Sequence, residues 1–325
     1  MILITGARGH IGNTLLYELS REYGKDNLKI FVKSSKGIDY IKDLAGEVVI
    51  GDIRNFDEVL HAVKDCEYVY HTAAVISLGK KVTKELYGCN VLGTRNIVNA
   101  CLKSGVKRLI YTSSVETLKT PKKGKIQENL ADIKDADGAY AYTKILANRE
   151  IDKGREQGLD IISVYPSAVI GTRDYKGSYS KKIISYYKSR FFIKFYFKGA
   201  YNFVDVRDIA LALKNAMTAN NNCNDYILAN QKQDLKQVAK LIGNAVNKKS
   251  VYVRIPYFLL ITMAFLYNGV LKLFGKTSVF NPYSISILQR NCDFDIQKAK
   301  RDLNFCPREL NQTFFDTVNW LENNK

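Results

Sequence analysis

The sequence has few of the residues that build metal sites or disulfide frameworks. Among 325 residues there are six cysteines and three histidines, and no two cysteines form a C-x-x-C pair. The ligand spacing of a structural zinc site is therefore absent. Scattered cysteines of this kind are typical of a reducing compartment, so we expect a cytoplasmic location.

Long apolar runs are also scarce. The mean hydropathy is -0.19, which excludes a polytopic membrane protein. We expect no signal peptide, because Met1 leads directly into an apolar run at 2–5 with no positively charged region before it. No internal repeat and no Gly/Ser-rich or Pro-rich linker divides the chain.

Acidic residues are too few to balance the basic ones. Lys and Arg number 49 and Asp and Glu number 32, which gives a net charge of +17. Such a charge favours anionic partners, whether a phosphorylated ligand, an acidic substrate, lipid head groups or nucleic acid. A lysine-rich solvated surface is the simpler interpretation.

The first half of the chain alternates short apolar runs with helical stretches. The runs predict strands at 2–5, 29–32, 48–50, 68–72, 108–113 and 160–165, and the stretches between them predict helices that include 11–23, 57–63, 82–102 and 140–157. Strands that are apolar throughout are buried on both faces. The fold class we predict is α/β, with a Rossmann-type doubly wound parallel sheet.

Three glycines follow the first predicted strand and open the first predicted helix. Gly6 would permit a tight turn, Gly9 would let the backbone approach a pyrophosphate, and Gly12 would allow close packing of the helix on the strand. The helix N-terminus offers N–H groups to phosphate oxygens. The strand-before and helix-after context predicts a dinucleotide site.

The second half has a different composition, dense in Tyr, Phe and Lys from 175 to 203. It predicts helices at 206–218, 235–246 and 313–323 and a strand at 226–229. We predict that residues 1–170 form a dinucleotide-binding domain to which 203–230 return. Residues 171–202 and 231–325 would form a smaller, mostly helical substrate-binding domain.

Motifs along nearly the whole chain carry a family resemblance. The glycine spacing G-x-x-G-x-x-G, the Gly-Asp-Ile-Arg at 51–54, the His-Thr-Ala-Ala at 71–74, the Tyr-Thr-Ser-Ser at 111–114 and the Y-x-x-x-K at 140–144 occur in this order. Together they resemble the extended branch of the short-chain dehydrogenase/reductase superfamily. That branch includes nucleotide-sugar epimerases, dihydroflavonol reductases and 3β-hydroxysteroid dehydrogenases.

The resemblance implies a set of cofactor contacts. It places an Asp against the adenine, here Asp52, and Lys144 on the ribose hydroxyls of the nicotinamide half. The full set of residues predicted to bind the cofactor comprises Gly6, Arg8, Gly9, His10, Ile11, Gly12, Lys33, Asp52, Ile53, Ala73, Ala74, Asn90, Thr112, Tyr140, Lys144, Tyr165, Pro166 and Val169.

Ser114, Tyr140 and Lys144 are the predicted catalytic residues. Tyr140 and Lys144 are four residues apart and share a helix face, whereas Tyr142 points elsewhere. A cation roughly 4 Å from a phenol at an effective dielectric of ~20 is worth ~4 kcal/mol. Lys144, with an oxidised nicotinamide, would thus bring the pKa of Tyr140 toward neutrality. By the family pattern, Ser114 hydrogen-bonds the substrate oxygen.

The residues after the second predicted strand favour NADP(H). An NAD site carries an acid about twenty residues beyond the glycines, but 32–35 reads Val-Lys-Ser-Ser and no acid occurs from 32 to 38. Lys33 and Arg8 would attract a 2′-phosphate. NAD(H) is the alternative.

Three enzymatic functions are compatible with these residues. We favour an NADP-dependent carbonyl reductase, or the reverse alcohol dehydrogenase, acting on a small molecule. The alternatives are a nucleotide-sugar epimerase or dehydratase that holds NAD tightly, and a membrane-associated sterol-type dehydrogenase. A non-enzymatic dinucleotide sensor ranks last, because such relatives usually lose the Tyr or Lys that this chain keeps.

Two segments bear on partners. Residues 179–203 mix lysines with aromatics, a composition found in single-strand binders, but we predict a substrate-pocket wall and no nucleic acid. The apolar stretch 255–274 predicts a pocket-capping helix, with peripheral membrane contact as the second choice. A homodimer is the other predicted partner.

Overall fold

The computed structural model describes residues 1–77, 79–177, 184–185, 193–220, 224–274 and 281–324. At its centre is a seven-stranded parallel sheet of order β10-β6-β5-β4-β1-β2-β3. Its strands, in chain order, are β1 (Ile2–Thr5), β2 (Leu28–Val32), β3 (Glu47–Ile50), β4 (Tyr68–His71), β5 (Arg108–Thr112), β6 (Ile161–Pro166) and β10 (Asp225–Leu228).

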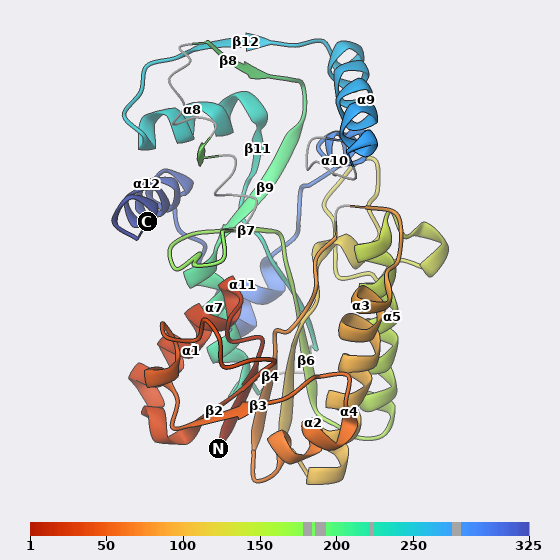
Figure 1. Ribbon diagram of the computed structural model, residues 1–325, viewed down its shortest axis with the longest axis vertical. Helices are drawn as coiled ribbons and strands as arrows, with labels where there is room; N and C mark the ends of the chain where they lie inside the picture. Colours follow the sequence, from red (N-terminus) through yellow and green to blue (C-terminus); the bar gives the residue numbers. More distant parts are fainter. Residues whose placement is uncertain (78, 178–183, 186–192, 221–223, 275–280, 325) are drawn as a thin grey trace.

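Helices cover both faces of this sheet (Figure 1). On one face lie α1 (His10–Tyr23), α7 (Val206–Ala216) and α11 (Gln297–Leu303); on the other lie α2 (Phe56–Val63), α4 (Gly93–Ser104) and α5 (Ala139–Glu156). The strands supply both cores, since Ile2 and Ile4 of β1 pack with the first set and Leu3 with the second. The predicted doubly wound fold is confirmed.

Two predicted elements differ in detail. β3 is not buried on both faces, because it is an edge strand with only β2 beside it, and both Glu47 and Ile50 are exposed. The helix expected at 82–102 is three pieces: α3 (Lys84–Tyr87), a π-helical turn (Gly88–Leu92) and α4. Such π turns are frequent near functional sites.

The second half adds two small sheets above the main one. β7 (Ala168–Ile170), β9 (Ala200–Asp205) and β11 (Lys232–Asp234) form one, and β8 (Ile193–Tyr196) pairs with β12 (Val251–Arg254) in the other. The helices with them are α8 (Leu235–Ala245), α9 (Tyr257–Leu273), α10 (Pro282–Ile287) and α12 (Leu310–Asn323). Phe203, Val238 and Phe314 are buried together between these elements.

The chain crosses between the two parts several times. β10 pairs with β6 in the main sheet, and α7 packs beside α1, although both follow β7 and β9 in sequence. α11 also packs on the main sheet, within the range predicted for the substrate domain. The exact domain boundaries stay a prediction.

Some predictions concern residues outside those that the structure describes. Residues 178–183 and 186–192, which hold most of the basic and aromatic segment, lie outside the described residues. Within the described part, no helix has both the length and the apolar character needed to cross a membrane.

Candidate active site

A cavity of about 1260 Å³ lies at the carboxyl ends of the parallel strands. Its floor comes from Gly9 to Gly12 after β1 and from Thr72 and Ala74 after β4. β1 and β4 are neighbours at the point where the strand order reverses. Ligands of open α/β sheets bind at this switch point.

The turn between β1 and α1 has the shape of a phosphate cradle. Gly6 has a φ of 73°, and a Cβ on it would lie 2.5 Å from the backbone nitrogen of Ala73. A Cβ on Gly12 would overlap the carbonyl oxygen of Gly6, whereas one on Gly9 would lie 3.2 Å from that oxygen. None of the described side chains caps α1. The bare N-terminus therefore fits a pyrophosphate.

The three predicted catalytic residues all line the cavity. Ser114 follows β5, and Tyr140 and Lys144 lie one turn apart on α5. Tyr142 is exposed on the other side of the helix. Ser113 turns away from Ser114, and its hydroxyl donates to Asn148 Oδ1 at 2.8 Å.

Lys144 is buried against β5. Its Nζ donates to Tyr111 Oη at 3.0 Å and to the carbonyl oxygen of Thr112 at 2.7 Å. Burial lowers the pKa of Lys144 to about 7, because the charged form loses its hydration. The ammonium is thus poised to titrate near neutrality.

The pKa of Tyr140 moves the opposite way from the prediction. Burial raises it first and the carboxylate of Glu116 raises it further, while a hydrogen bond from Ser114 lowers it. The lowering expected from Lys144 together with an oxidised nicotinamide stays a prediction for the complex, but Lys144 does not lower this pKa in the protein by itself. The reason is geometric and electrostatic, since the Lys144 ammonium is directed at Tyr111 and Thr112 and is itself destabilised by burial.

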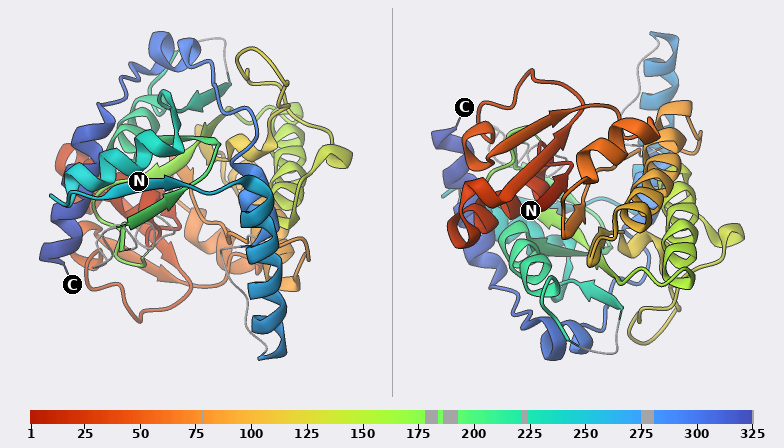
Figure 2. Two further views of the ribbon diagram at one scale, coloured as in Figure 1. Left: turned by 90° about the horizontal axis from the view of Figure 1, so that it is seen from above. Right: turned by 90° about the horizontal axis from the view of Figure 1, so that it is seen from below.

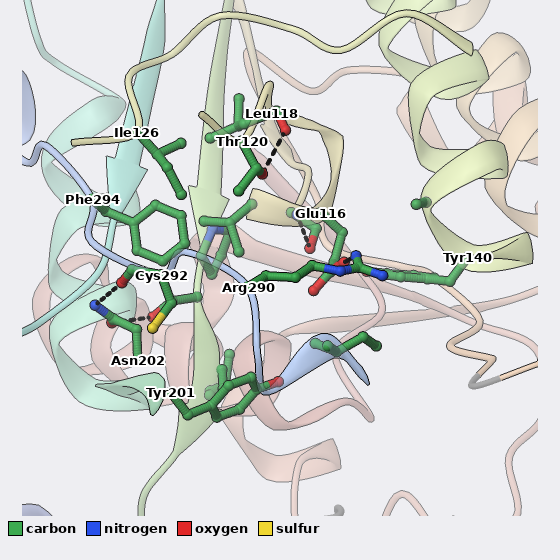
Figure 3. A pocket seen from close by; sticks show the side chains of 18 of the residues that line it. Glu116, Leu118, Thr120, Ile126, Tyr140, Tyr201, Asn202, Arg290, Cys292 and Phe294 are labelled. Atoms are coloured by element: carbon green, nitrogen blue, oxygen red, sulfur yellow. Dashed lines mark hydrogen bonds and ion pairs between the residues drawn. The ribbon is translucent and has the colours of Figure 1, made fainter. Parts of the chain in front are cut away.

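Sequence reasoning missed a polar cluster beside Tyr140 (Figure 3). Glu116 lies in the turn after Ser114, with its Oε2 at 4.0 Å from Arg290 Nη1. Arg290 also pairs with Asp137, whose carbonyl oxygen accepts a hydrogen bond from the hydroxyl of Tyr283. Burial raises the pKa of Glu116 and Arg290 lowers it. Burial and the Glu116 charge raise the pKa of Tyr283 to about 12.

Basic groups gather where the second strand ends. The Arg8 guanidinium lies beside Gly37, and its buried Nε has no hydrogen-bond partner among the described residues. Burial and the charge of Arg8 lower the pKa of Lys176. Lys33 Nζ is 3.9 Å from Asp52 Oδ2, and Arg54, as the main cause, lowers the pKa of Asp52 to about 2.

The predicted cofactor residues divide into two groups. Those that line the cavity are Gly9, His10, Ile11, Gly12, Ala74, Thr112, Tyr140, Lys144, Pro166 and Val169. Those outside its lining are Gly6, Arg8, Lys33, Asp52, Ile53, Ala73, Asn90 and Tyr165.

Two members of the second group use their side chains for hydrogen bonds within the protein. The Asn90 amide bonds the backbone of Val75 and the hydroxyl of Thr143. The Tyr165 hydroxyl donates to Asp225 Oδ1 at 2.8 Å. Their side chains therefore support the site from behind and do not face it.

The upper wall of the cavity is largely apolar. It includes Phe195, Phe197, Tyr201, Phe203, Ile287, Leu288 and Phe294. Lys119 and Lys125 stand among polar residues elsewhere on the lining. No described residue of α9 lines the cavity, and α10 takes that place through Tyr283 and Ile287. The prediction of 255–274 as a pocket cap is therefore wrong.

The described residues include no group of three or more His, Cys, Asp or Glu side chains that could hold a metal ion. The site places a phenol, a hydroxyl and an amine around a cavity that begins at a phosphate cradle. A doubly wound sheet with this set defines a nicotinamide-dinucleotide enzyme of the short-chain dehydrogenase/reductase type.

Comparison with known proteins agrees. Residues 2–229 match the model of the NAD dependent epimerase/dehydratase family, and the chain belongs to that family. The chain is 29% identical to a "Putative dihydroflavonol 4-reductase" of Synechocystis sp., over 98% of this chain and 94% of the relative. It is 26% identical to "Sterol demethylase protein B" of Methylococcus capsulatus, over 98% and 97%.

A solved structure titled "Crystal structure of gox2253" superposes with a TM-score of 0.84 at 26% identity, covering 99% of this chain and 98% of that one. These matches confirm the predicted resemblance to extended short-chain dehydrogenases/reductases.

Proposed function

We propose that this protein transfers a hydride between NADPH and a carbonyl or alcohol substrate. The observation that carries the proposal is that Ser114, Tyr140 and Lys144 line one cavity with the β1–α1 phosphate cradle. The nicotinamide supplies the hydride when it is bound. The protein's own groups then handle the proton and the orientation of the substrate.

Tyr140 would exchange the proton with the substrate oxygen. A phenol whose pKa is raised by burial and by Glu116 stays protonated near neutral pH, so it is ready to donate to a carbonyl. The Ser114 hydroxyl would donate to the same oxygen and steady the charge that develops on it. Lys144 would hold the ribose hydroxyls and, only together with an oxidised nicotinamide, favour the tyrosinate. This arrangement suits carbonyl reduction.

The preference for NADPH rests on charge at the end of β2. Arg8, Lys33 and Lys176 supply cations there, and a 2′-phosphate would supply the partner that the buried Arg8 Nε lacks among the described residues. Asp52 lies 3.9 Å from Lys33, but it is also paired with Arg54, which offsets the negative charge that would repel the phosphate.

A bulky apolar ketone or alcohol is the substrate class that the cavity wall fits. Aromatic and aliphatic side chains of β8, β9 and α10 would pack against ring systems. The names of the two relatives refer to a dihydroflavonol and to a sterol, both of which are polycyclic. A sterol-type alcohol is therefore part of this proposal.

The test is a panel of ketones, aldehydes and secondary alcohols of increasing ring number with NADPH or NADP⁺. The proposal expects turnover that improves with ring size and prefers the phosphorylated cofactor. Turnover limited to small polar aldehydes would contradict the substrate class, and equal use of NADH would contradict the cofactor preference.

A nucleotide-sugar epimerase or dehydratase is the second candidate. Lys119 and Lys125 on the cavity lining could pair with a diphosphate. The two functions separate when the purified protein is heat-denatured and the released nucleotide is identified. Stoichiometric NAD favours the epimerase, and little nucleotide or NADPH favours the reductase.

A further inference from the structure

Exposed apolar side chains are concentrated at one end of the molecule. Among the described residues, 21 large hydrophobic side chains are exposed. Fourteen of them lie on α9, the residue after it, and the β8–β12 pair: Ile193, Phe195, Val251, Val253, Tyr257, Phe258, Leu259, Met263, Phe265, Leu266, Tyr267, Val270, Leu273 and Phe274. We call this surface the apolar end. It occupies the top of the molecule in Figure 1.

α9 contributes most of the apolar end. Its inner side is narrow, with Leu260 and Ala264 buried against Ile285 of α10. Phe258 and Phe265 are exposed by 73% and 70%, although an interior helix would bury such residues. The views from above and below both show α9 projecting past the rest of the molecule (Figure 2). The helix is therefore apolar on the side that faces away from the protein.

The β8–β12 pair continues the same surface. Ile193 lies opposite Val251 and Phe195 opposite Val253, and all four are exposed. Alternate residues of a strand share one face, so these four form a single apolar ladder. The backbone N–H of Ile255 bonds the carbonyl oxygen of Tyr196, which fixes the ladder to the start of α9. Phe195 also lines the cavity, so the cavity reaches this end of the molecule.

The stretches of sequence that contain the apolar end also contain most of the excess positive charge. Segments 175–204 and 235–292 contain no Asp or Glu and fifteen Lys or Arg residues. That leaves 34 basic against 32 acidic residues for the remainder of the chain, so nearly all of the +17 belongs to these two segments. Lys198, Lys248, Lys249 and Arg254 are among their exposed cations.

We propose that the apolar end docks on the surface of an anionic phospholipid bilayer, with α9 inserted at the level of the head groups. Exposed aromatic and aliphatic side chains supply burial in the interface, and the surrounding cations bind lipid phosphates. A second copy of this chain fits poorly, because it would bring two strongly basic surfaces together. Docking would need no rearrangement of α9, because its inner side is already packed on α10 and its outer side is already exposed.

Vesicle flotation of the full chain tests this docking. The probes are vesicles of phosphatidylcholine alone and of phosphatidylcholine with phosphatidylglycerol, at low and high salt. We expect binding to the mixed vesicles at low salt, and binding weakened but not abolished by high salt, because burial of apolar side chains is not screened. Absence of binding to the mixed vesicles at low salt would overturn the proposal.

Matched variants show whether vesicle binding depends on the apolar end or on hydrophobic and basic residues anywhere on the surface. Phe258→Ser/Phe265→Ser/Leu266→Ser should weaken vesicle binding by at least about tenfold. Ile50→Ser/Leu211→Ser/Phe315→Ser, which alters three exposed hydrophobics elsewhere, should leave it unchanged. Lys249→Glu/Arg254→Glu should remove the preference for anionic lipid. Lys64→Glu/Lys103→Glu makes the same charge change at the C-terminal ends of α2 and α4 and should keep that preference.

Far-UV circular dichroism and NADPH affinity show whether each variant is folded. Equal loss of binding in the control variants would refute the assignment of the surface. If the three α9 substitutions change only the mass of the particle in sedimentation and vesicle binding stays as in the wild type, the apolar end serves self-association, and the lipid proposal fails.

Discussion

At Tyr140 the surrounding groups determine the pKa of the phenol. Burial and the Glu116 carboxylate raise its pKa, and the Ser114 hydrogen bond lowers it. Two opposing effects act on the pKa of Glu116 itself: burial raises it and the charge of Arg290 lowers it. In the proposed mechanism, Glu116 would therefore act on the proton chemistry through Tyr140 without touching the reacting atoms.

Glu116→Gln should therefore change the pH profile of the reaction. Removal of a carboxylate that raises the pKa of Tyr140 lowers that pKa. Alcohol oxidation needs the deprotonated phenol, so its rising limb should move to lower pH. The pH profile of kcat/KM checks this, with the distant Glu67→Gln as control. An unchanged limb, or one moved to higher pH, would contradict the role of Glu116.

Lys33→Asp should reverse the cofactor preference. The new carboxylate would repel a 2′-phosphate and would accept hydrogen bonds from a ribose 2′-hydroxyl. We expect NADPH affinity to fall by about tenfold or more and NADH affinity to rise, since a charge-assisted contact is lost. Titration of both cofactors measures this, with Lys25→Asp as control. If wild-type protein binds NADH as tightly as NADPH, the preference for the phosphorylated cofactor is wrong.

The residues of the site differ in how visible they are in the sequence. Tyr140, Lys144 and Ser114 stand at spacings that the chemistry itself requires, so sequence alone could nominate them. Arg290 could not be found, because only the fold brings it from beyond α10 to Glu116. The pKa of Tyr140 was also out of reach, since it depends on burial and on the direction of the Lys144 ammonium.

Among the elements, the turn from β1 to α1 is tightly constrained by space. A Cβ on Gly12 would overlap backbone and Thr72, whereas a Cβ on Gly9 would meet one carbonyl oxygen at 3.2 Å. Gly12→Ala should therefore destabilise the protein by about 1–3 kcal/mol, as overpacking does, and weaken NADPH binding. Gly9→Ala should cost less stability. Chemical denaturation of both variants measures the order, and a reversed order would contradict the packing described.

Elements of the main sheet could be predicted because each carries its own pattern. Its buried strands are continuous apolar runs, and the long helices have apolar faces. β7 has only three residues, and β8, β11 and β12 each include a Lys or Arg among their three or four residues, so no continuous apolar run marks them. α9 was foreseen as an apolar helix, but its neighbours decide whether it closes the cavity, and α10 does so instead.

At the scale of the whole molecule, the buried amine of Lys144 should make the free energy of unfolding depend on pH. The pKa of Lys144 is about 7 in the folded protein, against a usual value of 10.5. Between these values the unfolded chain binds the extra proton, so the free energy of unfolding should rise with pH by up to about 1.4 kcal/mol per unit. Below pH 7 both states are protonated and this contribution is flat.

Lys144→Met removes the titrating group and should remove that slope. Denaturant unfolding at intervals from pH 7 to pH 10 compares the variant with wild type, and Lys153→Met on the exposed side of the same helix is the control. A slope that persists in Lys144→Met would assign it to another group.

Turnover and cofactor affinity of Tyr140→Phe, measured on one preparation with NADPH and a polycyclic ketone, test the central claim most directly. The phenol hydroxyl is proposed to carry the proton, while the cradle and Lys144 bind the cofactor. We therefore expect turnover to fall by at least about 10²-fold, with NADPH affinity within a factor of two of wild type. Tyr142→Phe, on the exposed side of α5, should keep full turnover. Wild-type turnover in Tyr140→Phe would contradict the proposed chemistry.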